Sequence, residues 1–159
     1  MSNICKFSSF RSENYLSAYD STTQTISSAT EAFSWKFNTI DISRGITITD
    51  LSKITFSQKG IYNIQFSAQL KTTTGSDTIV YIWPRKNGVN IPYSNTVYDI
   101  KGGGKAEVAV LNYLLSLEKD DFVEIMWSDS TTTTLASETS SNNPLKPEIP
   151  SVILTVWGI

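Results

Sequence analysis

The side chains that most often perform chemistry in proteins are scarce in this sequence. Histidine is absent, which removes imidazole general bases, His-paired serine and cysteine nucleophiles, and the commonest metal ligand. The single cysteine, Cys5, excludes an internal disulfide and a thiolate metal cage. Serines are plentiful, and a Ser-Lys pair stays open, but no serine has an evident base partner. We predict no catalytic residue, no cofactor and no enzymatic activity.

Two charged segments have only a superficial likeness to ligand sites. The Lys101-Gly-Gly-Gly-Lys105 segment lacks the spacing of a phosphate-binding loop and a following helix, so we interpret it as a flexible connection. Glu118, Asp120 and Asp121 fall between two strand-like segments, where Asp is ordinary turn chemistry. They provide no full set of oxygen ligands. We therefore predict no metal site.

Aromatic side chains supply the remaining chemistry. Trp35, Trp83, Trp127 and Trp157 have flat faces of the kind that stack on sugars. Each lies in a segment with strand periodicity, which favours packing in a core or at an interface. No sugar site follows from the tryptophans alone.

Composition narrows the class of partner. Lys and Arg number 13 against 15 Asp and Glu, and the net charge of −2 lacks the basic footprint of a nucleic-acid-binding protein. No apolar run approaches the roughly 20 residues of a membrane span. The segment 1–20 contains no apolar core of a secretory signal. We expect a protein that binds neither nucleic acid nor membrane and does not pass through a secretory pathway.

The elements that would have to position any site are β-strands. The 159 residues include 22 Ser and 19 Thr, together with many Val, Ile, Tyr and Phe, which is typical of an all-β domain with polar loops. The segment 60–70 alternates most clearly between apolar and polar residues. Asn87-Gly88 is the best hairpin-turn dipeptide. Eight to ten expected strands, one of them short and near 132–136, indicate a sandwich or barrel.

Two expected strands are apolar on both faces, whereas a sandwich core covers only one face of each strand. In 108–117, Val108, Val110 and Leu114 lie opposite a second apolar face. The last strand has Val152, Leu154 and Val156 opposite Ile153, Thr155, Trp157 and Ile159. We interpret the surplus face as an oligomer interface, and the alternative is that a loop or the N-terminal segment covers it.

The N-terminal segment mixes polar and aromatic residues without a clear period. We divide the chain into a tail, 1–16, and one domain, 17–159. The tail is either an anchor that packs on a capsid or another partner, or an extra strand of the same domain.

Four segments resemble, in the same order, motifs of the tumour necrosis factor (TNF) and complement globular-head jelly rolls. They are 56–66, with its G-x-Y-x-(aliphatic)-x-F pattern, Asn87-Gly88, 115–123 and 151–156. Asp120 stands where the family has glycine. The resemblance covers nearly the whole chain and implies an antiparallel jelly-roll β-sandwich.

The amino-acid sequence resembles even more closely the virion-surface members of that family in tailed bacteriophages and other viruses. The similar stretches are FNTIDISRGI (37–46), GIYNIQFSAQ (60–69), IWPRKNG (82–88), EIMWS (124–128) and IPSVILTV (149–156). Such proteins decorate heads, form head fibres or cap fibre tips.

The resemblance implies a homotrimer whose inner sheet faces the threefold axis. The axis-facing positions would be Asn63, Gln65, Val108, Val110, Asn112, Leu114, Val152, Leu154 and Val156. The chain has no collagen-like stalk, no disulfide and no carboxylate cluster that would carry over a calcium site. Signalling and calcium-dependent recognition are therefore not implied.

These observations lead to two expectations for function. The first is a non-catalytic virion structural protein, assembled in the host cytoplasm, that binds a major capsid or other virion protein. The alternative is a fibre head that binds a host glycan or receptor through the loops at 72–78, 99–105 and 129–149. Because one fold serves several roles, the sequence does not distinguish a head protein from a fibre tip.

Overall fold

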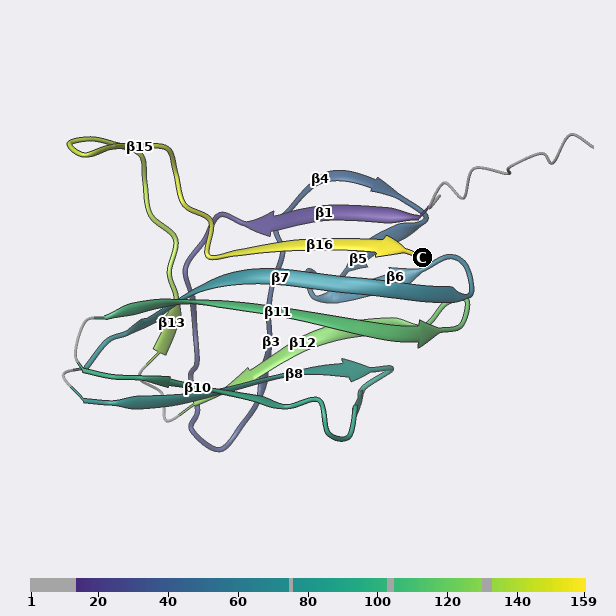
Figure 1. Ribbon diagram of the computed structural model, residues 1–159, viewed down its shortest axis with the longest axis horizontal. Helices are drawn as coiled ribbons and strands as arrows, with labels where there is room; N and C mark the ends of the chain where they lie inside the picture. The colour runs from purple at the N-terminus through teal and green to yellow at the C-terminus, as the bar shows by residue number, and fades with distance from the viewer. Residues whose placement is uncertain (1–13, 75, 103–104, 130–132) are drawn as a thin grey trace, which may run out of the picture.

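Two antiparallel sheets form the body of the protein in Figure 1, a computed structural model that describes residues 14–74, 76–102, 105–129 and 133–159. The first sheet has β7 at its centre, with β11 along one edge and β16 and β13 along the other. Its strands are β1 (Tyr15–Asp20), β2 (Gln24–Thr25), β4 (Thr39–Arg44), β7 (Gly60–Thr72), β11 (Ala106–Leu117), β13 (Thr133–Leu135) and β16 (Val152–Gly158).

The second sheet runs in the order β10-β8-β12-β6-β5, with β3 added beside β12 and β9 beside β8. Its strands are β3 (Phe33–Ser34), β5 (Ile46–Thr49), β6 (Lys53–Phe56), β8 (Thr78–Lys86), β9 (Val89–Asn90), β10 (Thr96–Ile100) and β12 (Phe122–Ser128). The described residues contain no helix, and strand neighbours that are distant in sequence make this an antiparallel jelly-roll sandwich, as predicted.

The core lies between the two sheets and follows the period of two that the sequence shows. The apolar face of 60–70 is buried throughout, and Phe66 at its centre meets Trp35 edge to face with ring centroids 4.6 Å apart. Trp127 is buried on the second sheet. Trp35 and Trp127 thus pack in the core, as their periodicity predicted, and burial of such large apolar surfaces stabilises the sandwich.

Two turns at one end of the sandwich are joined by a carboxylate. Asn87 and Gly88 both have positive φ, 49° and 80°, as the predicted tight hairpin requires. Asp120 has a φ of 66° at the position where the resembling family has glycine, and aspartate tolerates this region better than most residues. Asp121 accepts hydrogen bonds from the Asn87 side chain at 2.6 Å and from the Glu118 amide at 2.7 Å. The acidic segment is turn chemistry, as predicted.

The predicted boundary between tail and domain, 16/17, falls inside a strand. β1 begins at Tyr15, and the Leu16 side chain is buried in the core, so residues 15 and 16 belong to the sandwich. The alternation of apolar and polar residues in β1 is too short to identify a strand from the sequence alone. The pairing of β1 with β16 shows that it is one. The rest of the predicted tail, 1–13, lies outside the described residues.

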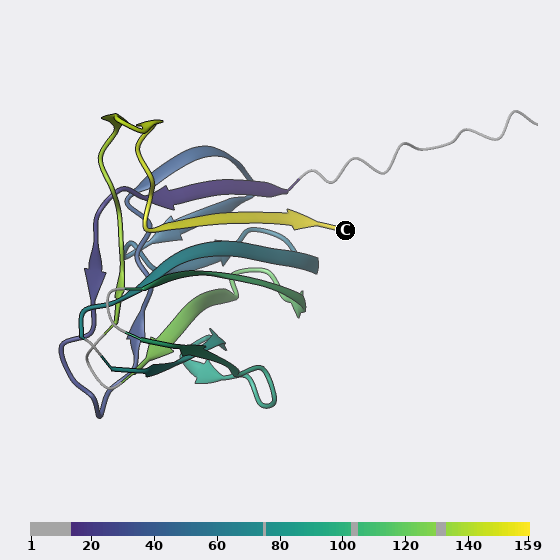
Figure 2. The ribbon, with the colours of Figure 1, turned by 60° about the vertical axis from the view of Figure 1, so that its left-hand side comes forward.

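The predicted loop 129–149 contains the short strand β13 and then a projecting hairpin. Figures 1 and 2 show β14 (Ser141–Asn142) and β15 (Leu145–Lys146) as an arm that stands away from the sandwich. Two backbone hydrogen bonds between Glu138 and Ile149, both 2.9 Å, close its base. Leu145 near the tip is 85% exposed, so the arm contributes little to the core.

Candidate functional site

The face of the first sheet that points away from the core is the candidate site. Along β16, the register with β7 decides which side chains occupy it, because directly opposite residues of an antiparallel pair lie on one face. Val152, Leu154 and Val156 are fully buried. Their partners on β7 are core residues: Ala68, Phe66 and Ile64. The prediction that these three β16 residues face a threefold axis is therefore wrong.

The opposite residues of β16 occupy the outer face instead. Ile153 is 42% exposed and Trp157 36%, and Thr155 between them is also exposed. Both faces of β16 are apolar, so alternation alone could not choose between them. Only the pairing with β7 shows which face of β16 points to the core. Sequence reasoning assigned the buried residues to the outer face.

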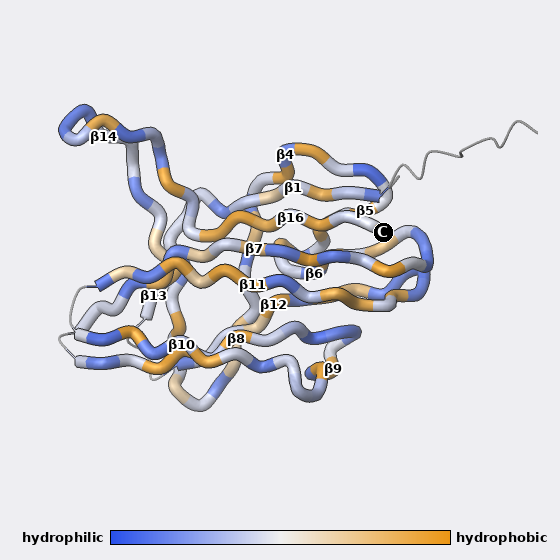
Figure 3. The backbone as a smooth tube through the Cα atoms, viewed as in Figure 1, coloured by the Kyte–Doolittle hydropathy of each residue, from blue (hydrophilic) through white to orange (hydrophobic). Residues whose placement is uncertain are grey.

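β11 presents the predicted face to solvent. Val108, Val110 and Leu114 are 52–62% exposed on the outer side, with Asn112 exposed among them. Figure 3 shows hydrophobic stretches running along β11 and β16. These four residues lie where the sequence placed them, opposite the core, and their role in an interface stays a prediction.

A polar row crosses the middle of the outer face. Gln65 lies between Thr155 on one side and Asn112 on the other, and Ser17 follows beyond Thr155. Apolar and aromatic side chains flank this row. On one side lie Tyr15, Trp157 and Leu114, and on the other lie Tyr19, Ile153 and Val110. We define these ten residues, together with Val108 and Asn63, as the outer face of the first sheet.

Asn63 is the one predicted site residue of the outer face that is buried. It lies between Trp157 and Leu114 in the strand register and is 5% exposed. Its amide nitrogen has no hydrogen-bond partner among the residues that the structure describes. A buried donor without an acceptor lowers the stability of the fold by about 1–3 kcal/mol. An acceptor supplied to this amide from outside the chain would recover that loss.

A groove of about 460 Å³ borders the outer face where the arm begins. Tyr19 and Ile153 of the sheet contribute to its lining, together with Glu138, Ile149 and Pro150 at the arm's base. Lys146 Nζ lies 2.6 Å from a Glu138 carboxylate oxygen and lowers the pKa of that carboxyl. The ion pair is exposed, and it closes the arm rather than activating a group for catalysis.

The three predicted binding loops meet at one end of the sandwich. Asp77 accepts a 2.8 Å hydrogen bond from the Gly102 amide, which joins 72–78 to 99–105. This bond and the neighbouring Lys101 lower the pKa of Asp77. The Thr72 amide donates to the Lys105 carbonyl, and β13 pairs with the end of β7. Residues 75, 103–104 and 130–132 of these loops lie outside the described part.

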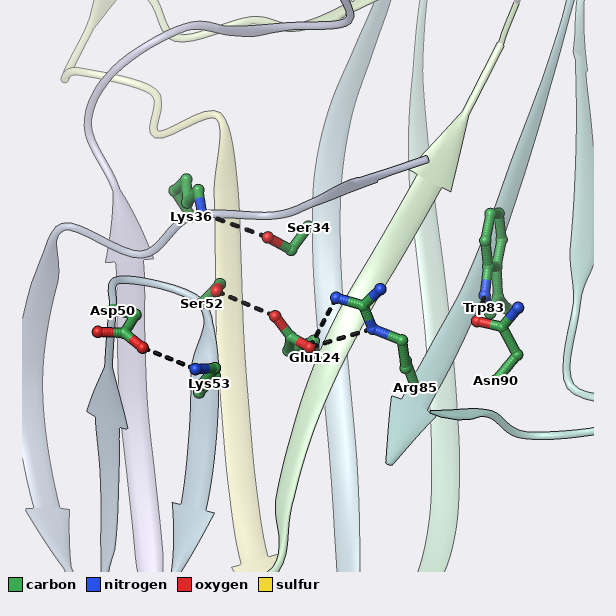
Figure 4. Close-up of polar contacts among 9 residues, drawn as sticks. All are labelled: Ser34, Lys36, Asp50, Ser52, Lys53, Trp83, Arg85, Asn90 and Glu124. Atoms are coloured by element: carbon green, nitrogen blue, oxygen red, sulfur yellow. Dashed lines mark hydrogen bonds and ion pairs between the residues drawn. The ribbon is translucent and has the colours of Figure 1, made fainter. Parts of the chain in front are cut away.

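Sequence reasoning also missed a partly buried ion pair on the second sheet. Arg85 donates through Nε and a terminal nitrogen, at 3.1 and 2.8 Å, to the same carboxylate oxygen of Glu124 (Figure 4). Ser52 donates to the other oxygen at 3.3 Å. All three groups are committed to one another, so the cluster holds β12, β8 and the β5–β6 turn together rather than forming an open catalytic site.

The described residues contain no group of three or more His, Cys, Asp or Glu side chains placed to hold a metal ion. Cys5 falls outside this part of the chain. A search of the described residues for a helix able to cross a membrane also found none.

No known protein-family profile matches the sequence, and no curated protein does. Solved structures do match. The globular domain of a zebrafish complement 1qA protein superposes with a TM-score of 0.54 at 13% identity, over 92% of this chain and 97% of that one. Murine APRIL superposes with a TM-score of 0.57 at 8% identity, over 92% and 98%. The fold is a TNF- and C1q-like jelly roll. At these identities the likeness concerns the fold alone.

Proposed function

We propose that this TNF- and C1q-like jelly roll is a non-catalytic head that associates with copies of itself through the outer face of the first sheet. The observation that carries the proposal is the exposed apolar side chains on both sides of β7: Val108, Val110 and Leu114 on β11, and Ile153 and Trp157 on β16. So many exposed apolar side chains on one face of a sheet are typical of an interaction surface.

The character of the outer face fits self-association. Its central row, with Gln65 and Asn112, is polar, so contacts between copies would have a hydrogen-bonding stripe between apolar flanks. The buried Asn63 amide would gain an acceptor from another copy. We infer a homotrimer, which is what the family resemblance of the sequence implies for this sheet.

The place of action that we propose is a virion surface, after assembly in the host cytoplasm. Its support is the set of sequence stretches similar to phage and viral surface proteins, such as 60–69 and 149–156. A major capsid or other virion protein would bind the trimer, with the segment 1–13 or one end of the trimer as the contact. The trimer would stabilise the particle through buried area and by bridging neighbouring subunits.

The mass of the purified chain in solution tests the self-association. We expect three chains by light scattering, and we expect Val110→Asp to reduce the mass because it places a charge in an apolar contact. Val89→Asp is the matched control, since Val89 is 70% exposed on β9 of the second sheet. A wild-type mass of one chain at all concentrations, or an unchanged Val110→Asp trimer, would contradict the proposal.

The virion role has a separate test. Purified protein should bind empty capsids that lack it, in a fixed number of copies per capsid, and a truncation that starts at residue 14 should lose that binding if the tail is the anchor. Binding to cells but not to capsids would favour the receptor-binding alternative.

A further inference from the structure

The second sheet carries an aromatic surface on the side of the molecule away from the self-association face. Tyr81 and Trp83 alternate with buried Ile82 along β8, so their rings project outward together. Tyr93, in the connection between β9 and β10, is fully exposed. Trp83 is half-buried and Tyr81 is 39% exposed. The core does not account for these three rings.

The three rings border a hollow of about 290 Å³. The remaining polar lining includes Asn90, Asn95 and Ser128. No Asp, Glu, Lys or Arg is among the described residues that line it. A second hollow shares Tyr81 and Ser128 with the first and continues beyond them to Ile79, where Asp77 and Asp129 also line it. The surface is therefore an elongated trough, and its part beside Trp83 is neutral.

The orientation of Trp83 is held by a hydrogen bond. Its indole nitrogen donates to the Asn90 side-chain oxygen at 2.8 Å, as Figure 4 shows. This bond fixes the ring plane before any ligand arrives, which lowers the entropy lost on binding. Among the described residues, no partner is found for the amide nitrogen of Asn90 or for the side-chain amide of Asn95. Both amides are available to a ligand in the trough.

Tyr93 follows Pro92 in a turn that gives it a positive φ, a position that glycine or asparagine usually takes. Its φ of 59° lies in the left-handed region, which is unfavourable for a bulky side chain, and its ring packs on nothing in the chain. Residues held in such conformations cluster at functional sites. Here the backbone conformation holds an aromatic ring at the rim of the hollow.

From this geometry we infer that the trough formed by Tyr81, Trp83 and Tyr93 binds a neutral oligosaccharide. The apolar faces of sugar rings stack on aromatic faces, and their hydroxyls pair with amides and hydroxyls such as Asn90, Asn95 and Ser128. The described lining beside Trp83 offers no cation, and the carboxylates of Asp77 and Asp129 lie in the second hollow, so the trough disfavours acidic or phosphorylated ligands. The length of the trough favours two or more linked sugars over one.

The position of the trough disfavours an extended peptide. A peptide that adds to a sheet needs an unpaired strand edge. β8 is paired with β10 on one edge and with β12 on the other, so the trough lies on a sheet face rather than an edge. The site also lies on the sheet opposite the self-association face, so this inference and the proposed function can fail independently.

An array of neutral gluco-, galacto- and manno-oligosaccharides of two to seven units, printed beside sialylated and sulfated glycans, tests the inference. We expect saturable binding of the full-length protein to at least one neutral oligosaccharide. That oligosaccharide is then titrated against the variants with tryptophan fluorescence and calorimetry. Binding only to charged glycans, or to none on the array, overturns the inference.

Two variants separate binding from folding. Tyr93→Gly removes the ring and relieves the strained φ, so we expect unfolding no easier than in the wild type but affinity at least about tenfold weaker. Trp83→Ala should weaken binding by at least as much. Trp157→Ala, an exposed tryptophan on the first sheet, is the matched control and should change the oligomer mass but not sugar affinity. Affinity that survives both trough variants overturns the site.

Discussion

Asp121 shows how a single side chain joins two turns that are 34 residues apart. Lys86 Nζ lies 2.6 Å from one carboxylate oxygen, and the Asn87 side chain and the Glu118 amide donate to the carboxylate. Lys86 first, and then these hydrogen bonds, lower the pKa of Asp121 from its ordinary 3.8 to about 2. The sequence predicted turn chemistry here, but not the link between the turns.

We predict that Asp121→Asn removes part of the acid sensitivity of the fold. Because the folded pKa lies below the unfolded one, the carboxylate stabilises the protein above about pH 4, and this contribution disappears as the pH falls toward 2. Its size is about 1 kcal/mol after solvent screening of the ion pair. Urea unfolding at pH 7, 4 and 2 should show the variant less stable at pH 7 and equal to wild type near pH 2.

Asp120→Asn is the control for this measurement. The Asp120 side chain is 74% exposed, and asparagine also tolerates its left-handed φ, so stability at each pH should match the wild type. Equal pH dependence of Asp121→Asn and wild type would show that the carboxylate does not act as described.

At the scale of elements, β16 is a strand whose orientation depends on its neighbour. Val152 and Val156 of one face and Ile153 of the other are all apolar, so each face suits a core. The pairing with β7 determines which face of β16 is buried, because the core face of β7 is clear from its alternation of apolar and polar residues. A strand with one clear face thus orients a strand with two.

We predict that Leu154→Asp prevents folding rather than dissociating an oligomer. The side chain is fully buried, so the substitution places an unpaired charge in the core at a cost of more than about 3 kcal/mol. Circular dichroism and denaturant unfolding should show a largely unfolded chain. Thr155→Asp, one residue along on the exposed side, should fold. A folded, soluble Leu154→Asp protein of reduced oligomer mass would restore the sequence-based face assignment.

For the whole molecule, the two outward faces have different characters. The first sheet exposes aliphatic side chains beside a polar row, which suits contact with identical copies. The second sheet exposes the Tyr81, Trp83 and Tyr93 rings around neutral amides. A self-associated head would therefore keep its proposed sugar trough open to solvent.

We predict that the thermal midpoint rises with protein concentration. Association that occurs only in the folded state stabilises that state by mass action. Calorimetry over a hundredfold range of concentration should show the increase for wild type, while Val110→Asp should have a lower midpoint that does not depend on concentration. A constant wild-type midpoint over a range in which light scattering reports dissociation would contradict the coupling.

The sequence by itself determined the all-β class, the core face of 60–70, the Asn87-Gly88 turn and the absence of imidazole chemistry. These depend on alternation, on local backbone preference and on which side chains are present, all of which are local properties. Tertiary structure alone decided the orientation of β16, the membership of Leu16 in the core and the trough beside Trp83. Each of these depends on strands distant in sequence, whose register determines which side chains share a face.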